Sequence, residues 1–299
     1  MNKKFLHIFL LLTLLVLSLN EGFSQHKPKN RYHSRHLMYM NNIRVTGMVG
    51  LSSYYGDLCD DFLCFRYRPG ITVGAYYRYN GRISFRGDLT YLRLSGHDKN
   101  GDNARRNLSF KSPNLELAAG IMYDLIYFER NYHIRAQFTP YLFLEAGMFY
   151  FNPKAEYNGT TYALRPLKTE GVKYNSITMA IPFGGGVRYK INSYMDVSFE
   201  LAYRKTFTDY IDDVSTVYQD KSTFDDPVAE ALSDRSAEHG FYKNGLPAGN
   251  KRGNPNKKDG YFLFGIKFEY MIATTQQLHN LNSMPRFRHR NPGMHRKYR

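Results

Sequence analysis

The segment MDVSFELAYRKTFTDY, residues 195–210, alternates between apolar and polar side chains along most of its length. Because successive side chains of a strand point to opposite faces, this period of two predicts a β-strand with one apolar face and one charged face. The segment GYFLFGIKFEY, residues 260–270, repeats the pattern, with Lys267 and Glu269 on its polar face. In the first segment the apolar positions are Val197, Phe199, Leu201, Tyr203 and Phe207.

Eight segments of this kind follow one another along the chain. Most reach the roughly 9–11 residues that a tilted strand needs to cross a bilayer. The connections at 80–82 and 191–195 are short, whereas four others are long, as is typical of outer-membrane barrels with short turns at one end and long loops at the other. The predicted strands are 43–54, 71–79, 82–95, 108–127, 137–151, 176–190, 195–210 and 260–272.

The polar face of these strands decides between two all-β architectures. A soluble barrel or sandwich would also alternate, but its core could not pair many buried charges. The polar faces carry ten charged residues, which a small membrane barrel accommodates because its interior is polar and filled by side chains. We therefore predict an eight-stranded antiparallel transmembrane β-barrel of the outer-membrane type with a plugged lumen. The ten residues are Arg78, Arg86, Asp88, Glu116, Glu145, Arg188, Glu200, Arg204, Lys267 and Glu269.

The first 24 residues are typical of a secretory signal peptide. Lys3 and Lys4 precede the apolar run from Phe5 to Leu19, and small residues follow at Gly22 and Ser24. A retained membrane helix is the alternative, but the run is shorter than the roughly 20 residues that such a helix needs. With an even number of strands, we expect an outer-membrane protein with both mature termini in the periplasm and its long loops outside.

The net charge of +15 lies mostly at the two ends of the chain. Removing the signal segment takes away one charge, and residues 25–42 then supply four and residues 273–299 six of the remaining fourteen. We predict a barrel over 43–272 between two flexible basic periplasmic segments. The tail fits an acidic protein or lipid head groups, its exported location disfavours nucleic acid, and a merely solvated tail is the alternative. Its bases are Arg286, Arg288, Arg290, Arg296, Lys297 and Arg299.

Cys59 and Cys64 are the only cysteines of the chain and lie in the segment LCDDFLC. An exported chain meets oxidising conditions, which favours a local disulfide between them. Free thiols and a metal site are the alternatives, although no second pair of ligands with matching spacing accompanies them.

Two aromatic and acidic segments follow predicted strands. In SSYYGDL, residues 52–58, Tyr54 and Tyr55 are expected near the membrane interface, where amphipathic rings are favoured, and Gly56 and Asp57 are expected to begin a loop. In FTDYIDDVSTVY, the acids at 209, 212 and 213 could bind calcium, but the spacing of an EF-hand loop is absent. We expect these acids to pair with bases or to face water.

In this order, SSYYGDL (52–58), LTYLRLSGHD (89–98), LSFKSPNLELA (108–118), IPFGGGVRY (181–189) and FTDYIDDVST (207–216) resemble the PorG-like outer-membrane proteins of the type IX secretion system. The resemblance implies a structural role, in which the barrel ties a periplasmic ring of a lipoprotein and its partner protein to the outer membrane. The long basic tail departs from a minimal member. The residues that carry the signature are Tyr54, Tyr55, Gly56, Asp57, Asp209, Tyr210, Asp212 and Asp213.

Three functions compete on the sequence. The first is a non-catalytic anchor of a type IX-like secretion machine, in contact with the ring proteins and outer-membrane lipid. The second is a surface barrel that binds an external ligand or protein through its long loops. An enzyme would need a nucleophile and a base within hydrogen-bond reach, and although serines and histidines occur together in the loops, no triad motif is recognisable. We expect no catalysis, cofactor, metal or small-molecule substrate. The loop residues in question are Ser95, His97, Ser236 and His239.

Overall fold

The computed structural model describes residues 42–59, 66–98, 103–127, 135–192, 194–239 and 245–272. The predicted signal peptide, almost all of the basic segment 25–42, the basic tail 273–299 and Cys64 lie outside the described residues. In the described part of the chain, no helix is long and apolar enough to cross a membrane.

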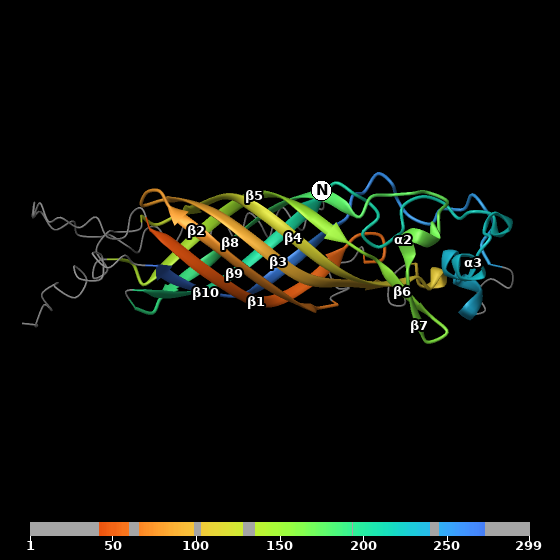
Figure 1. The fold of residues 1–299 in the computed structure, drawn as a ribbon, viewed down its shortest axis with the longest axis horizontal. Helices are drawn as coiled ribbons and strands as arrows, with labels where there is room; N and C mark the ends of the chain where they lie inside the picture. Colours follow the sequence, from red (N-terminus) through yellow and green to blue (C-terminus); the bar gives the residue numbers. More distant parts are fainter. Residues whose placement is uncertain are drawn as a thin grey trace, which may run out of the picture. The chain divides into compact units, whose positions relative to one another are not determined.

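Eight long strands form a closed antiparallel barrel (Figure 1), which confirms the predicted fold class. Each strand pairs with its neighbour, and β1 pairs with β10 from Ile43 opposite Ile272 to Tyr55 opposite Gly260, so no long strand has a free edge. The strands are β1 (Ile43–Tyr55), β2 (Arg68–Arg78), β3 (Ile83–His97), β4 (Ser109–Asp124), β5 (Phe138–Phe151), β8 (Ile177–Lys190), β9 (Met195–Thr206) and β10 (Gly260–Ile272).

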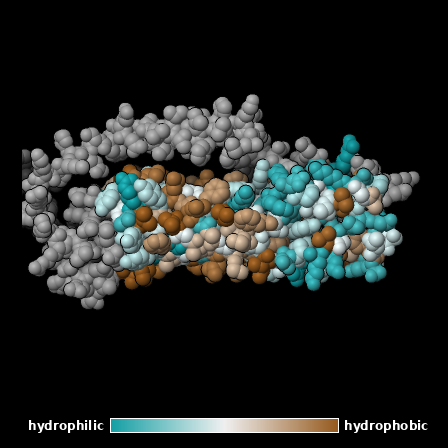
Figure 2. Space-filling view, turned by 90° about the horizontal axis from the view of Figure 1, so that it is seen from above, coloured by the Kyte–Doolittle hydropathy of each residue, from teal (hydrophilic) through white to brown (hydrophobic). Residues whose placement is uncertain are grey.

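The outer wall of the barrel is apolar. The exposed large side chains along the middle of the strands are aliphatic residues, Met or Phe, whereas tyrosines stand in a row near each end of the wall. Tyr77, Tyr123 and Tyr189 mark one row, and Tyr91 and Tyr150 mark the other. Figure 2 shows the hydrophobic residues gathered over the strands. An apolar band between two aromatic belts is the surface that a transmembrane barrel presents to lipid.

The lumen is filled by paired charges. All ten charged residues predicted to point inward are buried, which confirms the polar interior. Among the described residues, the buried bases and acids of the lumen number seven each, so their formal charges cancel. The bases are Arg44, Arg78, Arg86, Arg135, Arg188, Arg204 and Lys267, and the acids are Asp88, Glu116, Asp124, Glu145, Asp196, Glu200 and Glu269.

Arg86 is the centre of this network. Its guanidinium donates two hydrogen bonds to the carboxylate of Glu200, at 3.1 and 3.2 Å, and its Nε lies 3.1 Å from Glu145 Oε1. It also pairs with Asp88, while Lys267 Nζ lies 2.8 Å from Glu200 Oε2. The void beside these residues measures about 10 Å³, which is room for about one water molecule. Side chains therefore fill this part of the lumen, as expected for eight strands.

The two ends of the barrel differ. The turns that begin after β2 and β8 are tight, and they lie at the end where β1 begins and β10 finishes, here called the terminal end. The connection 125–137 between β4 and β5 also begins and ends at the terminal end, whereas the connections after β1, β3, β5 and β9 emerge at the opposite end. There they carry elements that the strand pattern did not predict: a hairpin of β6 (Lys154–Tyr157) and β7 (Thr160–Ala163), helices α2 (Leu164–Leu167) and α3 (Pro227–Ser233), and the short helical turns η2 (Ala104–Arg106), η3 (Lys221–Thr223) and η4 (Ser236–His239).

Candidate functional site

The long connections fold together into a cap over one end of the barrel. We define the cap as the described residues of 56–67, 98–108, 152–176 and 207–259. Its apolar side chains share one core with the ends of the strands, so the mouth is closed by packed residues. Phe149 and Phe151 of β5 contribute from below, and the cap contributes Leu58, Leu108, Leu164, Ile211, Val214 and Leu232.

Two buried arginines tie the connections of the cap to one another. Arg106 binds the carboxylate of Asp98 through two hydrogen bonds, at 2.7 and 3.1 Å, and donates to the carbonyl of Asp57 at 2.8 Å. Arg252 donates to Glu170 Oε1 at 2.9 Å and to the carbonyl of Asp213 at 2.6 Å. Because Arg106 also bonds to the carbonyl of Arg252, these contacts link all four connections.

Glu170 joins the connection after β5 to the connection after β9. Its carboxylate accepts hydrogen bonds from the backbone amides of Ser215 and Thr216, both at 2.9 Å, and from the Thr216 hydroxyl at 2.7 Å. Because this buried carboxylate accepts several hydrogen bonds and pairs with a guanidinium, the contact both stabilises the cap and fixes how the two connections fit together.

Tyr54 lies at the centre of the mouth, between two carboxyl groups. Its hydroxyl is 2.7 Å from Asp212 Oδ2 and 2.6 Å from Asp259 Oδ1. One phenol proton can be donated to only one of these oxygens, so the second contact requires a proton on a carboxyl group. Burial raises the pKa of both Asp212 and Asp259 well above the usual range, and nearby carboxylates add to the effect, that of Asp259 on Asp212 and that of Asp209 on Asp259. The trio therefore holds a shared proton.

The expectation that Tyr54 lies near the membrane interface is wrong. Its side chain points into the mouth and is 3% exposed, and its ring packs edge-on against Phe110 at 4.9 Å. Tyr55 points outward and is half-buried, with Lys257 Nζ 4.6 Å from its ring centre. Gly56 follows because a Cβ there would lie 2.0 Å from the Tyr54 hydroxyl. The glycine thus gives Tyr54 room to reach the carboxyl groups.

The acids after β9 are buried, so the expectation that they pair with bases or face water is also wrong. Asp213, whose φ is +65°, accepts hydrogen bonds from the hydroxyls of Thr169 and Tyr174. Burial raises its pKa to about 6 even though Arg252 is near. Asp209 accepts from the Ser215 hydroxyl at 2.7 Å, and its other oxygen is buried without a hydrogen bond.

Burial and the nearby acids Asp57 and Glu170 raise the pKa of Asp209 to about 7, against the opposing charge of Lys258. The remaining signature residues lie beside this cluster. The carboxylate of Asp57 accepts a hydrogen bond from the amide of Asn254 at 2.6 Å, and the ring of Tyr210 stacks on Tyr174 at 4.6 Å. The structure thus brings two segments of the predicted signature together at the mouth.

The remaining predicted sites are the cysteine pair, a metal site and the serines of the loops. Cys59 is buried in the cap core, and because Cys64 lies outside the described residues, the disulfide stays a prediction. Within the ranges that the structure describes, no group of three or more His, Cys, Asp or Glu residues is arranged to hold a metal ion. Ser95 accepts a hydrogen bond from Arg68 Nε at 2.9 Å, and Ser236 donates to Asp234 at 2.6 Å.

Residues 35–225 match a family model described as a domain of unknown function, DUF6089. No curated protein matches the chain. Similar solved structures include the Neisserial surface protein A (10% identity, TM-score 0.38, 76% of this chain and 96% of that chain), OprG of Pseudomonas aeruginosa (9%, 0.38, 79% and 97%) and a major outer membrane protein of Thermus thermophilus (11%, 0.39, 77% and 99%). Nothing about function follows from likenesses this distant.

Proposed function

Because the chain belongs to the DUF6089 family, a membership that by itself assigns no activity, we propose a function from its residues and its fold. The protein is a non-catalytic outer-membrane component of a type IX-like secretion machine, and it docks the periplasmic ring of that machine at the membrane. Its terminal end faces the periplasm and its cap faces outward. The partners are the ring lipoprotein and its partner protein.

The filled lumen is the observation that carries this proposal. In the part of the lumen that the structure describes, seven buried bases are matched by seven buried acids, and the mouth above them is packed with aromatic and aliphatic side chains. Breaking one buried ion pair typically costs about 3–5 kcal/mol, so opening a path through several of them is strongly unfavourable. A barrel of this kind serves as a stable anchor, and its working surfaces are its two ends.

The terminal end offers a compact surface for a periplasmic partner. Its tight turns expose Tyr79 and Ile191, and the connection after β4 exposes Tyr127. Arg82 places its guanidinium 5.9 Å from the ring centre of Tyr123. Exposed aromatics beside an arginine are the residue types enriched at protein interfaces. The basic tail would extend this surface. The sequence resemblance to PorG-like proteins supports the identity of the machine.

The test is recovery of ring proteins from mild detergent extracts of the native outer membrane. An affinity tag inserted between Phe224 and Asp225, in an exposed part of the cap, leaves the terminal end unchanged. Three proteins are compared: the full chain, a chain ending after Ile272, and a full-length chain whose six tail bases are changed to Gln. Partners are identified by mass spectrometry.

We expect the full chain to recover the ring lipoprotein and its partner. If both the shortened chain and the Gln-substituted chain fail to recover the ring proteins, the contact depends on the charge of the tail. If only the shortened chain fails to recover them, the contact depends on the presence of the tail and not on its charge. Retention in both assigns it to the turns. If the full chain recovers no secretion component from well-solubilised membrane, the proposal is wrong.

The second candidate is a surface barrel that binds an external ligand or protein. The packing of the cap favours it, because loops held by Arg106, Arg252 and Glu170 present a defined outer surface. It predicts that replacing the exposed residues of the cap abolishes function while the basic tail remains dispensable, which is the reverse of the anchor's behaviour.

A further inference from the structure

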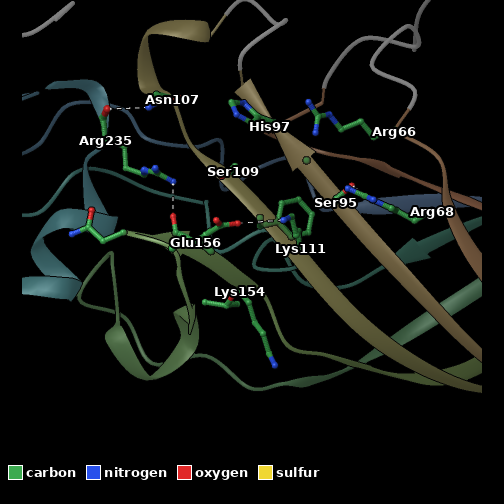
Figure 3. Close-up of a pocket in the computed structure, with 16 residues that line it drawn as sticks. Arg66, Arg68, Ser95, His97, Asn107, Ser109, Lys111, Lys154, Glu156 and Arg235 are labelled. Atoms are coloured by element: carbon green, nitrogen blue, oxygen red, sulfur yellow. Dashed lines mark hydrogen bonds and ion pairs between the residues drawn. The ribbon is translucent and has the colours of Figure 1, made fainter. Parts of the chain in front are cut away.

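A cavity of about 450 Å³ opens on the side of the cap, just above the barrel wall (Figure 3). The start of β2, the end of β3 and the start of β4 form one side of it, and the β6–β7 hairpin forms the other. Basic side chains line it from segments far apart in the sequence. In Figure 3, Arg66 and Arg68 lie on one side of Lys111, and Glu156 and Arg235 lie on the other.

The charge of this cavity is strongly positive. Arg235 is balanced by Glu238, to which its guanidinium donates two hydrogen bonds at 2.8 and 2.9 Å. The other lining bases are Arg66, Arg68, Lys111 and Lys154, and Glu156 is the one acid among the described lining residues, so four bases less one acid leave a charge of +3.

Two of the lysines stand directly opposite each other in the sheet. Lys111 of β4 is the register partner of Lys154 of β6. Like charges in this position destabilise a strand pair unless a counter-charge is near. Glu156 lies 3.6 Å from Lys111, and in the described part of the chain neither Lys154 nor Arg66 forms an ion pair. The sheet therefore holds cations together in a place that an anion would stabilise.

The height of the cavity fits the head-group layer of a membrane. On the outward face, Tyr91 and Leu115 are register partners in the upper aromatic row, and Arg93 and then Lys111 follow above them. Four residues of a strand tilted by about 40° rise about 10 Å, so Lys111 stands about 10 Å above Leu115. Arg68, whose Nε donates a hydrogen bond to the Ser95 hydroxyl at 2.9 Å, lines the same cavity.

We propose that this cavity binds the phosphate-bearing sugar head group of an outer-leaflet glycolipid. Lys111 and Lys154 supply point charges to phosphate oxygens, and Arg68 and Arg66 supply planar donors. The exposed apolar wall below, at Tyr91 and Leu115, receives the acyl chains. The inference rests on the proposed orientation, in which the cap faces outward.

The experiment measures binding of the purified full-length protein in a neutral detergent. The probes are diphosphorylated lipid A, the same lipid with its phosphates removed, and inorganic phosphate. The test variant is Lys111→Gln with Lys154→Gln. The matched control, Lys205→Gln with Lys251→Gln, removes the same charge from exposed lysines, of which Lys205 lies on the opposite wall. The heat-dependent shift of the barrel on electrophoresis checks that each variant is folded.

We expect lipid A to bind and its dephosphorylated form to bind at least tenfold more weakly. The test variant should raise the Kd for lipid A about tenfold, equivalent to about 1.4 kcal/mol, whereas the control should change it less than twofold. Added salt should weaken binding because the contacts are ionic and partly exposed.

Equal weakening in the two variants would overturn the site, since net charge alone would then explain binding. Equal affinity for the two lipids would overturn the role of phosphate, and binding of inorganic phosphate as tight as that of lipid A would reassign the cavity to a soluble anion. None of these measurements involves a secretion partner, so a negative result here does not bear on the recovery of the ring proteins that tests the proposed function. Labelling of the tag at Phe224–Asp225 on intact cells tests the orientation that the two proposals share.

Discussion

Tyr54→Phe removes the one hydroxyl that separates the carboxyl groups of Asp212 and Asp259 while keeping the ring that packs on Phe110. Each carboxyl group keeps a backbone amide, from Val214 and Ile211 respectively. A hydrogen bond to a charged group contributes about 1.5–3 kcal/mol, and buried carboxylates left short of a donor add to the loss, so we expect the cap to lose about 3 kcal/mol.

This loss falls on the cap and not on the barrel, because the strands keep all their ladder hydrogen bonds. A change of about 3 kcal/mol corresponds to more than a hundredfold increase in the population of the open cap. Hydrogen exchange of the backbone amides between Asp209 and Tyr218 measures it, since exchange there should accelerate by about that factor while exchange in β3 and β4 stays constant.

Tyr55→Phe is the matched control, because Tyr55 points outward beside the same loop. It should change exchange in the cap by less than threefold. If Tyr54→Phe behaves like this control, the hydroxyl does not hold the two carboxyl groups together and the shared proton has no structural role.

Three further perturbations test the cap and the lumen. The folded pKa values of about 6 for Asp213 and about 7 for Asp209 lie above the unfolded value of about 3.9. These two acids therefore stabilise the cap most below about pH 4, and the cap should lose stability as the pH rises to about 7. Hydrogen exchange of the cap amides, corrected for its intrinsic rate, should be at least tenfold faster at pH 8 than at pH 5, and Asp209→Asn should reduce this dependence. Arg86→Met leaves Asp88 and Glu200 with Lys267 and leaves Glu145 without an ion pair among the described residues. Urea unfolding from lipid vesicles should then show a loss of about 3–5 kcal/mol that an outward-facing Lys205→Met does not show. Gly56→Ala should displace Tyr54 and accelerate cap exchange as Tyr54→Phe does, and unchanged exchange would contradict the close approach at this glycine.

The barrel could be predicted from the sequence because side chains alternate between inward and outward along every strand of its wall. Arg86 and Glu200 are far apart in the chain, yet each stands at the inward parity of its own strand, so a period of two places both in the lumen. The same parity places Tyr54 on the inward face with Arg44 and Ser52. The interface prediction failed because it gave the preference of tyrosine for membrane interfaces more weight than this register.

The cap and the basic cavity could not be predicted in the same way. Ile211, Val214 and Leu232 have no common period, and they are buried only because other connections fold over them. Lys111 and Lys154 become neighbours through a pairing between β4 and a four-residue strand that has no alternation of its own. A local pattern carries no information about contacts that depend on the packing of several connections.

The two ends of the barrel can be separated by experiment, because the last register pair of β9 and β10 at the cap end joins Lys205 to Gly260. Replacing residues 209–257 with a short polar turn that carries the affinity tag removes the largest part of the cap and leaves this ladder intact. Aromatic side chains at the mouth, including Phe151, then lose their cover, so the variant should be less stable but should still insert and shift on heating. If the periplasmic ring docks at the terminal end, the variant should recover the ring proteins in the same amount per folded barrel as the full chain. A folded, inserted variant that no longer recovers them would place the contact at the cap end, and the anchor would then be oriented the other way.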